Sequence, residues 1–307
     1  MISVVIPIYR NEPFIDELYN RLIANLSTIT EDFELIFVND CSPDNSWSII
    51  IEYAKKDYRV KGISFSRNFG QHIAITAGIA KTSGEWIIVM DGDLQDKPEE
   101  IIHLYNKACE GYEVVFARRR ARKDSILKKL SSRIFYKIFD MLAGSKSDPS
   151  VANFGIYSRK VIDNFIKMQE HSRLFPQFIR WLGFNIAYKD VEHGERQTGK
   201  SAYTFRKKMD LAIDTIISMS NQPLKLFIKT GFLLSFLSFI YGVIIVIKYL
   251  VWGIPVQGWT SLIVSLYLLG GLILSTMGIL GLYIGKIYDE VKNRPLYIVD
   301  ETINFSK

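Results

Sequence analysis

The sequence contains few cysteines and histidines, and their spacing excludes two kinds of structural site. Its 307 residues include only Cys41 and Cys109 as cysteines, and these two do not form a Cys-x-x-Cys pair. Neither a disulfide framework nor a zinc site is therefore expected, and a reducing, cytosolic environment fits the soluble part of the chain. The four histidines also lack the spacing of metal ligands.

Charged residues are almost absent from residues 231–285, where Lys248 stands alone. The two apolar runs in this stretch, 231–252 and 259–285, each supply the roughly 20 residues that are needed to cross about 30 Å of hydrocarbon. Lys248 lies near the end of the first run, where its side chain can reach the membrane interface. We therefore predict a C-terminal transmembrane hairpin.

The residues around this hairpin predict its orientation. The link at 253–258 is short and uncharged, whereas both outer flanks are basic. The flanking basic residues are Lys225, Lys229, Lys286, Lys292 and Arg294. By the positive-inside rule, both outer flanks lie on the cytoplasmic side of the inner membrane, and so do both termini.

Small residues form a stripe on the second apolar run. They are Gly271, Ser275, Gly278 and Gly285. Such a stripe allows a close approach of helices, either of the first run or of another protomer in a homo-oligomer.

The N-terminal part of the chain alternates apolar strands with helical patterns. Ile2–Ile8 and Phe33–Asn39 are short apolar runs, and helical patterns follow them at 12–26 and at Ser46–Lys56. A third strand at 62–66, a helix at 71–81 and a fourth strand at 86–90 continue the series. This alternation predicts an α/β fold with a mostly parallel sheet.

Polar residues follow three of these strands, and ligands of such sheets gather at the carboxyl ends of strands. The three segments are Tyr9-Arg10-Asn11-Glu12, Asn39-Asp40 and Asp91-Gly92-Asp93. Two carboxylates one residue apart at a turn can share a hard cation that also holds a pyrophosphate. In isolation, however, backbone capping in a turn explains Asp91 and Asp93 more simply.

A basic amphipathic pattern occupies residues 125–143. Apolar residues recur there at helical spacing, and Lys128, Lys129, Arg133 and Lys137 fall between them. Such a helix can lie in a membrane interface, and an ordinary surface helix packed on a core is the alternative. Because these charges alternate with apolar residues beside two apolar runs, we do not expect nucleic-acid binding.

Several ordered motifs surround the two aspartates. They are Val5-Ile6-Pro7-Ile8-Tyr9-x2-Glu12, Val38-Asn39-Asp40-x-Ser42-x-Asp44, Ser66-Arg67-Asn68-Phe69-Gly70-Gln71, Gly199-Lys200-Ser201-x-Tyr203 and Glu290-Val291-Lys292-Asn293-Arg294-Pro295. Together they strongly resemble family 2 glycosyltransferases of the GT-A fold over nearly the whole chain. The resemblance is closest to the polyprenyl-phosphate branch, which includes dolichyl-phosphate mannose synthases and bacterial undecaprenyl-phosphate (bactoprenol) glycosyltransferases.

This resemblance implies a donor site for a nucleotide-sugar. The implied nucleoside residues are Pro7, Tyr9, Glu12 and Asp40, with Asp40 on the base. The implied ligands of Mg²⁺ or Mn²⁺ are Asp91, Asp93 and Gln95, with Gly92 between the two carboxylates. A cation there would neutralise the charge that grows on the departing nucleoside diphosphate.

The resemblance also implies an acceptor side. Arg119 aligns with the arginine that closes the strand after the metal motif, and Arg122, Lys129 and Arg133 match basic residues near the acceptor phosphate. The loop with Arg196, Lys200, Ser201 and Tyr203 resembles a mobile phosphate clamp, although its Lys and Ser stand in exchanged order. Cations are needed there because the acceptor phosphate and the donor pyrophosphate repel each other. A basic face that attracts anionic lipid is the alternative for each acceptor cation.

The chain departs from the family pattern at two places. Many relatives have Asp-Phe-Arg-Leu where this chain has Asn153-Phe154-Gly155-Ile156. Asn153 can hydrogen-bond but cannot act as a base, which favours a base-free mechanism, a different sugar or a reduced activity. The sequence Gln177-Phe178-Ile179-Arg180-Trp181 matches a motif of processive polysaccharide synthases, but a packed structural helix explains it better.

The sequence thus predicts an inverting, metal-dependent transfer of a hexose, from UDP rather than GDP, to undecaprenyl or another polyprenyl phosphate. A phosphate oxyanion needs positioning and charge screening more than a base, and the expected catalytic residues are Asp93, Arg119, Arg133 and Asn153. The alternatives are a processive polysaccharide synthase and a non-catalytic membrane scaffold. The expected parts are a cytoplasmic GT-A domain (1–210), a juxtamembrane amphipathic segment (211–230), the two spans and a cytoplasmic tail (286–307).

Overall fold

The computed structural model describes residues 1–119, 151–171, 173–192, 194, 216–217, 220–252 and 258–305. Contacts divide the chain into two units. The first unit comprises Met1–Ser125, Ser147–Ala202 and Arg294–Lys307, and the second comprises Ile126–Lys146 and Tyr203–Asn293. The C-terminal residues, which were expected to form a tail, thus belong to the unit that contains the sheet.

One eight-stranded mixed sheet forms the centre of the first unit, in the order β7-β5-β6-β4-β1-β2-β3-β8. The strands are β1 Ile2–Ile8, β2 Phe33–Asn39, β3 Val60–Phe65, β4 Trp86–Val89, β5 Val114–Arg119, β6 Val151–Ser158, β7 Ile186–Val191 and β8 Val299–Ile303. Four neighbouring pairs are parallel and three are antiparallel. The α/β prediction is confirmed, although β6 and β8 make the sheet more mixed than expected.

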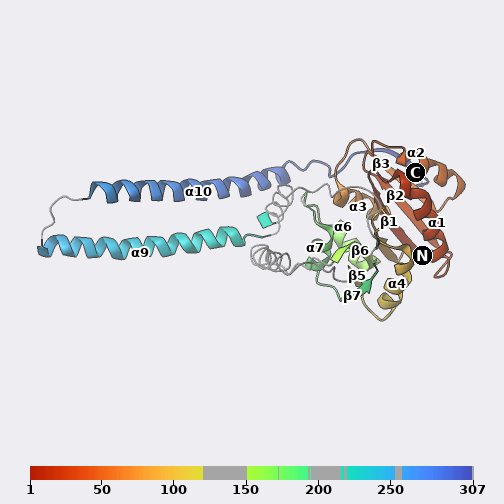
Figure 1. Cartoon of the computed structure of the whole chain (residues 1–307), viewed down its shortest axis with the longest axis horizontal. Coiled ribbons are helices and arrows are strands. Elements are labelled where there is room, and N and C mark those ends of the chain that lie inside the picture. Colours follow the sequence, from red (N-terminus) through yellow and green to blue (C-terminus); the bar gives the residue numbers. More distant parts are fainter. Residues whose placement is uncertain are drawn as a thin grey trace. The chain divides into compact units, whose positions relative to one another are not determined.

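Helices cover both faces of this sheet (Figure 1). One layer contains η1 Glu12–Phe14, α1 Ile15–Leu26, α2 Ser46–Lys56, η2 Pro98–Glu100 and α4 Ile101–Cys109. The other layer contains α3 Gln71–Ile79, α6 Arg159–Ile166 and α7 Phe175–Trp181. Because both faces are covered, every residue of β1 and β2 is buried, which explains why both strands are mostly apolar, with Ser3, Glu34 and Asn39 as the exceptions.

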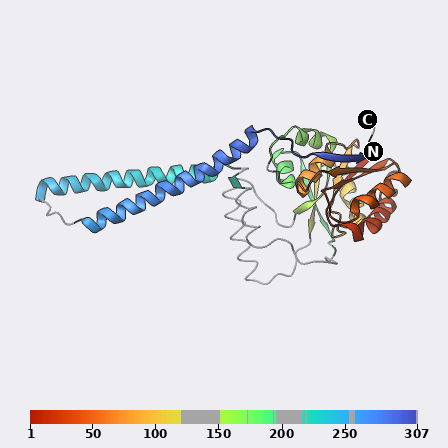
Figure 2. The same ribbon diagram turned by 90° about the horizontal axis from the view of Figure 1, so that it is seen from above.

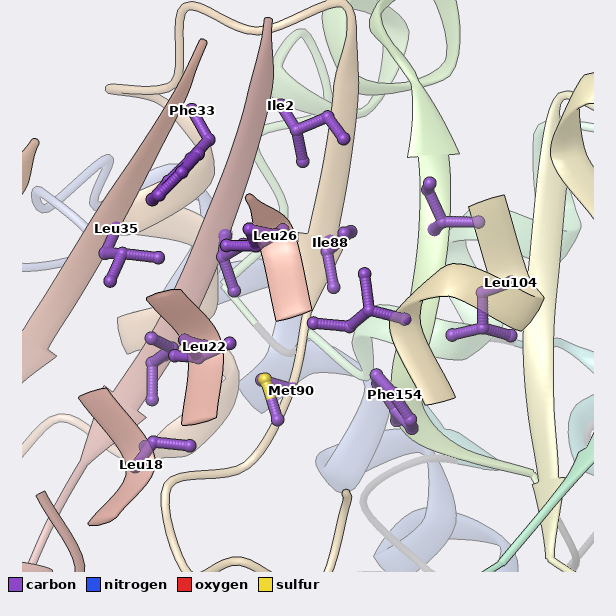
Figure 3. Packing of buried hydrophobic residues seen from close by; sticks show 14 of the residues in the cluster. Ile2, Leu18, Leu22, Leu26, Phe33, Leu35, Ile88, Met90, Leu104 and Phe154 are labelled. Carbon is purple, nitrogen blue, oxygen red and sulfur yellow. The ribbon is translucent and has the colours of Figure 1, made fainter. Parts of the chain in front are cut away.

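The main core lies between the sheet and α1. Leu18, Leu22 and Leu26 recur at helical spacing on one side of α1 and are fully buried. Figure 3 shows them facing strand residues such as Phe33 and Ile88. On the opposite face, α3 packs so closely on β1 that a Cβ added at Gly78 would lie 2.4 Å from Val5 Cγ1.

A buried carboxylate joins three strands near their amino ends. Glu34 of β2 accepts a hydrogen bond from the Ser3 hydroxyl (2.6 Å) and one from the Ser83 amide (2.6 Å). The Lys61 ammonium donates to its other oxygen at 2.6 Å. This cluster ties β1, β2 and β3 together at the edge of the sheet opposite the polar strand ends.

The second unit contains two long helices, α9 Gln222–Trp252 and α10 Trp259–Val291. Both are long and apolar enough to cross a membrane, with candidate spans at Gln222–Tyr241 and Ser265–Val291. Large apolar side chains such as Phe232, Tyr267 and Leu274 are exposed along them. The helices extend beyond the predicted runs, because α9 begins at Gln222 within the expected juxtamembrane segment and α10 continues to Val291. The interface helix expected at 125–143 lies outside the described residues.

Candidate functional site

The three polar segments identified in the sequence lie at one edge of the sheet. Strands β4, β1 and β2 are parallel neighbours, so their carboxyl ends point the same way. The connection after β2 stays close to β1, because the Asp40 amide donates to the Ile8 carbonyl at 2.9 Å. The Met90 amide likewise donates to the Val5 carbonyl at 3.2 Å. The predicted convergence of these segments is therefore present in the fold.

Asp40 is almost fully enclosed at this edge, with 3% of its surface exposed. Its two oxygens accept hydrogen bonds from the Phe69 amide (2.6 Å) and the Gly70 amide (2.9 Å). Burial raises the pKa of Asp40, although these two hydrogen bonds and the charge of Arg67 act in the opposite direction. The Asn68 side-chain amide also donates to the Asp40 carbonyl at 3.2 Å. Asp40 therefore fixes the loop that precedes α3.

Gly70 allows this loop to turn into α3. Its φ of 99° lies in the left-handed region, which a residue with a Cβ rarely adopts. The turn brings Gln71, the first residue of α3, to the next strand end. There the Gln71 side-chain amide donates to Asp91 Oδ1 at 2.6 Å. One short loop thus contacts both Asp40 and Asp91.

The segment after β4 is a tight turn. Asp93 Oδ1 accepts a hydrogen bond from the Gln95 amide at 3.1 Å, which is the capping role that local sequence favours. A Cβ at Gly92 would lie 2.7 Å from Ile8 Cδ1, so a larger residue there requires the end of the Ile8 side chain to move. Asp91 is held from both sides, since its amide also donates to Asp96 Oδ2 at 3.3 Å.

The donor atoms of this turn fit a hard divalent cation. Among the residues that the structure describes, no three His, Cys, Asp or Glu side chains group as a metal site. Mg²⁺ in proteins is commonly bound by one or two carboxylates, with water and substrate phosphates completing the shell. Asp91 and Asp93 offer two carboxylates of this kind, and their role as metal ligands, like that of the Gln95 side chain, stays a prediction.

Of the predicted nucleoside residues, Pro7 lies in β1, Tyr9 and Glu12 follow β1, and Asp40 follows β2. Tyr9 is 43% exposed and lies under the Arg10 guanidinium, 5.5 Å from the ring centroid. The Glu12 carboxylate accepts from the Asn45 amide (3.1 Å) and side chain (3.0 Å). Glu12 therefore braces the loops after β1 and β2 against each other. The Pro7 carbonyl lies 3.3 Å from the position of a Cβ at Gly92, so the end of β1 packs on the aspartate turn.

The departure at Gly155 has a packing reason. A Cβ at Gly155 would lie 2.7 Å from the Tyr157 hydroxyl and 2.8 Å from the Val115 carbonyl. The Tyr157 side chain is fully buried, and its hydroxyl donates to the Asn153 carbonyl at 3.1 Å. The tyrosine thus fills the space beside Gly155, and a larger side chain at 155 requires the ring to move. Asn153 itself lies on β6, half-buried.

The remaining predicted residues are mostly outside the described part of the chain. Arg119 is the last residue of β5, and the structure gives only its strand position. Those outside the described residues are Arg122, Lys129, Arg133, Arg196, Lys200, Ser201 and Tyr203. No role was predicted for Gln71 from the sequence, although its place at the start of a helix after a glycine was a usable signal.

Comparison with known proteins gives a family. Residues 3–166 match the model of glycosyl transferase family 2. An uncharacterised glycosyltransferase of Bacillus subtilis is 40% identical over 301 residues, which cover 98% of this chain and 93% of that protein. The SfII prophage-derived bactoprenol glucosyl transferase of Shigella flexneri is 36% identical over 302 residues, with 98% of each chain covered. The undecaprenyl-phosphate 4-deoxy-4-formamido-L-arabinose transferase of Proteus mirabilis is 33% identical over 309 residues, covering 100% and 95%.

Solved structures share the fold at low sequence identity. Mannosyl-3-phosphoglycerate synthase from Rubrobacter xylanophilus has a TM-score of 0.53 at 15% identity, with 75% of each chain covered. Glucosyl-3-phosphoglycerate synthase from Mycobacterium tuberculosis, crystallised with Mn²⁺, UDP and phosphoglyceric acid, has a TM-score of 0.52 at 15% identity, with 72% of this chain and 78% of that chain covered. The family model and the full-length relatives together establish that this chain belongs to glycosyl transferase family 2.

Proposed function

We propose that the chain transfers a hexose from a nucleotide-sugar, most simply UDP-glucose, to a polyprenyl phosphate such as undecaprenyl phosphate. The observation that carries the proposal is the shared loop that holds both Asp40 and Asp91 at one sheet edge. Full-length similarity to a bactoprenol glucosyl transferase supports the lipid acceptor. The two apolar helices supply a membrane anchor, which we propose to place the sheet-containing unit on the cytoplasmic side.

In the proposed donor complex, the nucleoside lies beside Asp40 and the pyrophosphate lies beside Asp91 and Asp93. A divalent cation bound there supplies positive charge for the departing diphosphate. The lipid phosphate oxygen forms a bond to the anomeric carbon as the bond from that carbon to the nucleoside diphosphate breaks, which inverts the configuration. Because this oxygen is already deprotonated near neutral pH, Asn153 has no proton to accept, and its proposed role is positioning.

The alternatives gain little from the structure. In the motif shared with processive synthases, the Arg180 guanidinium lies over the Phe116 ring, 5.3 Å from its centroid, as expected of a packed helix. Trp181 is 71% exposed on α7. The scaffold hypothesis rested on Asn153 and on the missing arginine at 155, and the packing of Tyr157 gives the glycine at 155 a structural reason. The homo-oligomer stays a prediction without support from the structure or the relatives.

The test is lipid labelling with an isosteric variant. Membranes that contain the chain are incubated with labelled UDP-glucose, undecaprenyl phosphate and Mn²⁺, and the lipid product is identified by mass. Asp93→Asn keeps the oxygen that caps Gln95 but removes the charge, so labelling is expected to fall by roughly 100-fold. Asp163→Asn on the exposed side of α6 is the control and is expected to label like wild type.

Three results would contradict parts of this proposal. Equal labelling by Asp93→Asn and wild type would remove the metal role of Asp93. A long water-soluble glycan in place of a lipid product would favour a processive synthase. Calorimetry that shows no metal-dependent binding of any nucleotide-sugar would favour a scaffold.

A further inference from the structure

Residues 294–305, here named the C-terminal strap, follow α10 and join the sheet at β3. In Figure 2 the strap is the dark-blue segment that ends near the C-terminus. Its strand β8 pairs antiparallel with β3, and the register shifts between Ser64 and Phe65. Trp47 donates to Glu301 at 2.7 Å, and the Asn304 side chain donates to the carbonyls of Ala54 (2.6 Å) and Val60 (2.8 Å). These bonds fix the far end of the strap.

The near end of the strap contacts the start of the connection from β3 to α3. Residues 65–71 of this connection are here named the donor loop. The Tyr297 ring stacks on Phe65, with 5.2 Å between centroids and an interplanar angle of 23°. Phe65 in turn meets Phe69 edge to face at 5.5 Å. The Ser66 amide donates to the Ile298 carbonyl at 3.1 Å. Two ring contacts and one backbone hydrogen bond therefore connect the strap to the donor loop.

Apart from the strap, the donor loop is held by its hydrogen bonds to Asp40 and Asp91 and by the Arg67 guanidinium, which lies 4.1 Å from the centroid of the Phe69 ring. Ser66, Arg67 and Asn68 are exposed, and Gly70 is in a left-handed conformation. Loops with little buried surface open locally at low free-energy cost. The Phe69 amide is nevertheless the group that binds Asp40 at 2.6 Å, and Gln71 binds Asp91. The position of Phe69 thus affects both Asp40 and Asp91.

The near end of the strap is also anchored beside α7. The Arg294 carbonyl pairs with the His171 ring at 2.8 Å. Arg173, two residues further, is buried, and its guanidinium binds the carbonyls of Glu170 and Met168. The backbone that leads to Tyr297 is therefore fixed to the unit that contains the sheet.

We propose that Tyr297 of the C-terminal strap is a positioning residue for the donor site: its ring holds Phe65 and Phe69 so that the donor loop keeps Asp40 and Asp91 in place. This inference rests on the proposed nucleotide-sugar site and assigns a role to a residue far from it in sequence. A donor binds only the ordered loop, so its apparent affinity falls with the fraction of molecules in that state. An aromatic pair contributes roughly a 2- to 12-fold change in such an equilibrium.

The experiment uses the full-length chain in detergent with UDP and Mn²⁺. Tyr297→Ala is expected to weaken UDP binding in calorimetry by roughly 2- to 12-fold. It is also expected to speed hydrogen–deuterium exchange in the peptide that covers residues 66–71. Tyr297→Phe keeps the ring, and the stacking does not use the hydroxyl. Its UDP affinity and the exchange rate of residues 66–71 are therefore expected to equal those of the wild type. The control Asn304→Gly loosens the far end of the strap, and glycine tolerates its φ of 61°.

Each outcome decides the inference. Loss of affinity and faster exchange in Tyr297→Ala alone support the positioning role. Unchanged values in Tyr297→Ala, or equal losses in Asn304→Gly, overturn it in favour of a general structural role. If the wild type binds no UDP, the proposed donor fails, and the exchange of residues 66–71 in the variants still supports or overturns the role of the strap.

Discussion

Removal of the Glu34 carboxylate tests what holds the strands behind the candidate site. The side chain of Glu34 is 2% exposed, and its partners are the Ser3 hydroxyl, the Ser83 amide and the Lys61 ammonium. Glu34→Ala deprives all three of their acceptor. Breaking a buried ion pair by removing one partner costs about 3–5 kcal/mol. Lys61 is 21% exposed and regains some water, whereas Ser3 is fully buried and does not.

We therefore expect Glu34→Ala to destabilise the chain by about 3–5 kcal/mol, or roughly 6–20 °C in melting temperature for a unit of this size. Glu34→Gln keeps a carbonyl acceptor and is expected to lose about half as much. Glu31→Ala is the matched control. The Glu31 side chain is 79% exposed and lies 3.9 Å from Arg59, so its removal is expected to change the free energy of unfolding by less than about 0.5 kcal/mol. Thermal melts followed by tryptophan fluorescence measure all three. A melting temperature for Glu34→Ala within about 2 °C of wild type would refute the argument.

Two further predictions concern α3, which carries Gln71. Gly78→Ala places a Cβ 2.4 Å from Val5 Cγ1. The cost of overpacking is expected to exceed the gain from the higher helix propensity of alanine, so the chain should be destabilised by about 1–2 kcal/mol. A higher melting temperature for Gly78→Ala would contradict this. His72 accepts a hydrogen bond from the Phe175 amide at 3.5 Å, and burial lowers the pKa of His72 to about 4. In the unfolded chain the imidazole takes up a proton near pH 6.5, whereas in the folded chain it does so only near pH 4. Between these two pH values the unfolded chain therefore binds more protons than the folded chain. The free energy of unfolding is expected to fall by up to about 3 kcal/mol as pH decreases through this window. Melts of wild type and His72→Asn between pH 7 and 4 should differ in slope, and parallel curves would show that the imidazole is not responsible.

Parts of the fold with local signals were predicted well from sequence. The bounds of β1, β2 and α2 agree with the structure, because runs of mostly apolar residues or helical periodicity mark them in the chain itself. The third strand begins at Val60 rather than Gly62, because pairing of Val60 with Leu35 extends it. That pairing is a property of the neighbouring strand and leaves no mark in the local sequence.

The strand at the C-terminus was not predicted. Val299–Ile303 contains the adjacent acidic residues Asp300 and Glu301, and its five residues resemble a polar tail when read alone. It becomes a strand because the edge of β3 offers unpaired backbone groups. Its contribution to the donor loop could not be inferred without that pairing, since Tyr297 and Phe65 are distant in the chain.

The sequence by itself determined the α/β alternation, the two long apolar helices and the family, because periodicity and motif order are written along the chain. It also marked Asp40, Asp91 and Asp93 as polar residues at strand ends. Only the tertiary structure decided that Gln71 holds Asp91, that Tyr157 fills the space beside Gly155 and that the C-terminal strap supports the donor loop. The physical reason is that these features depend on which distant segments pack together, and side-chain hydrogen bonds and close packing form only after the strands have paired.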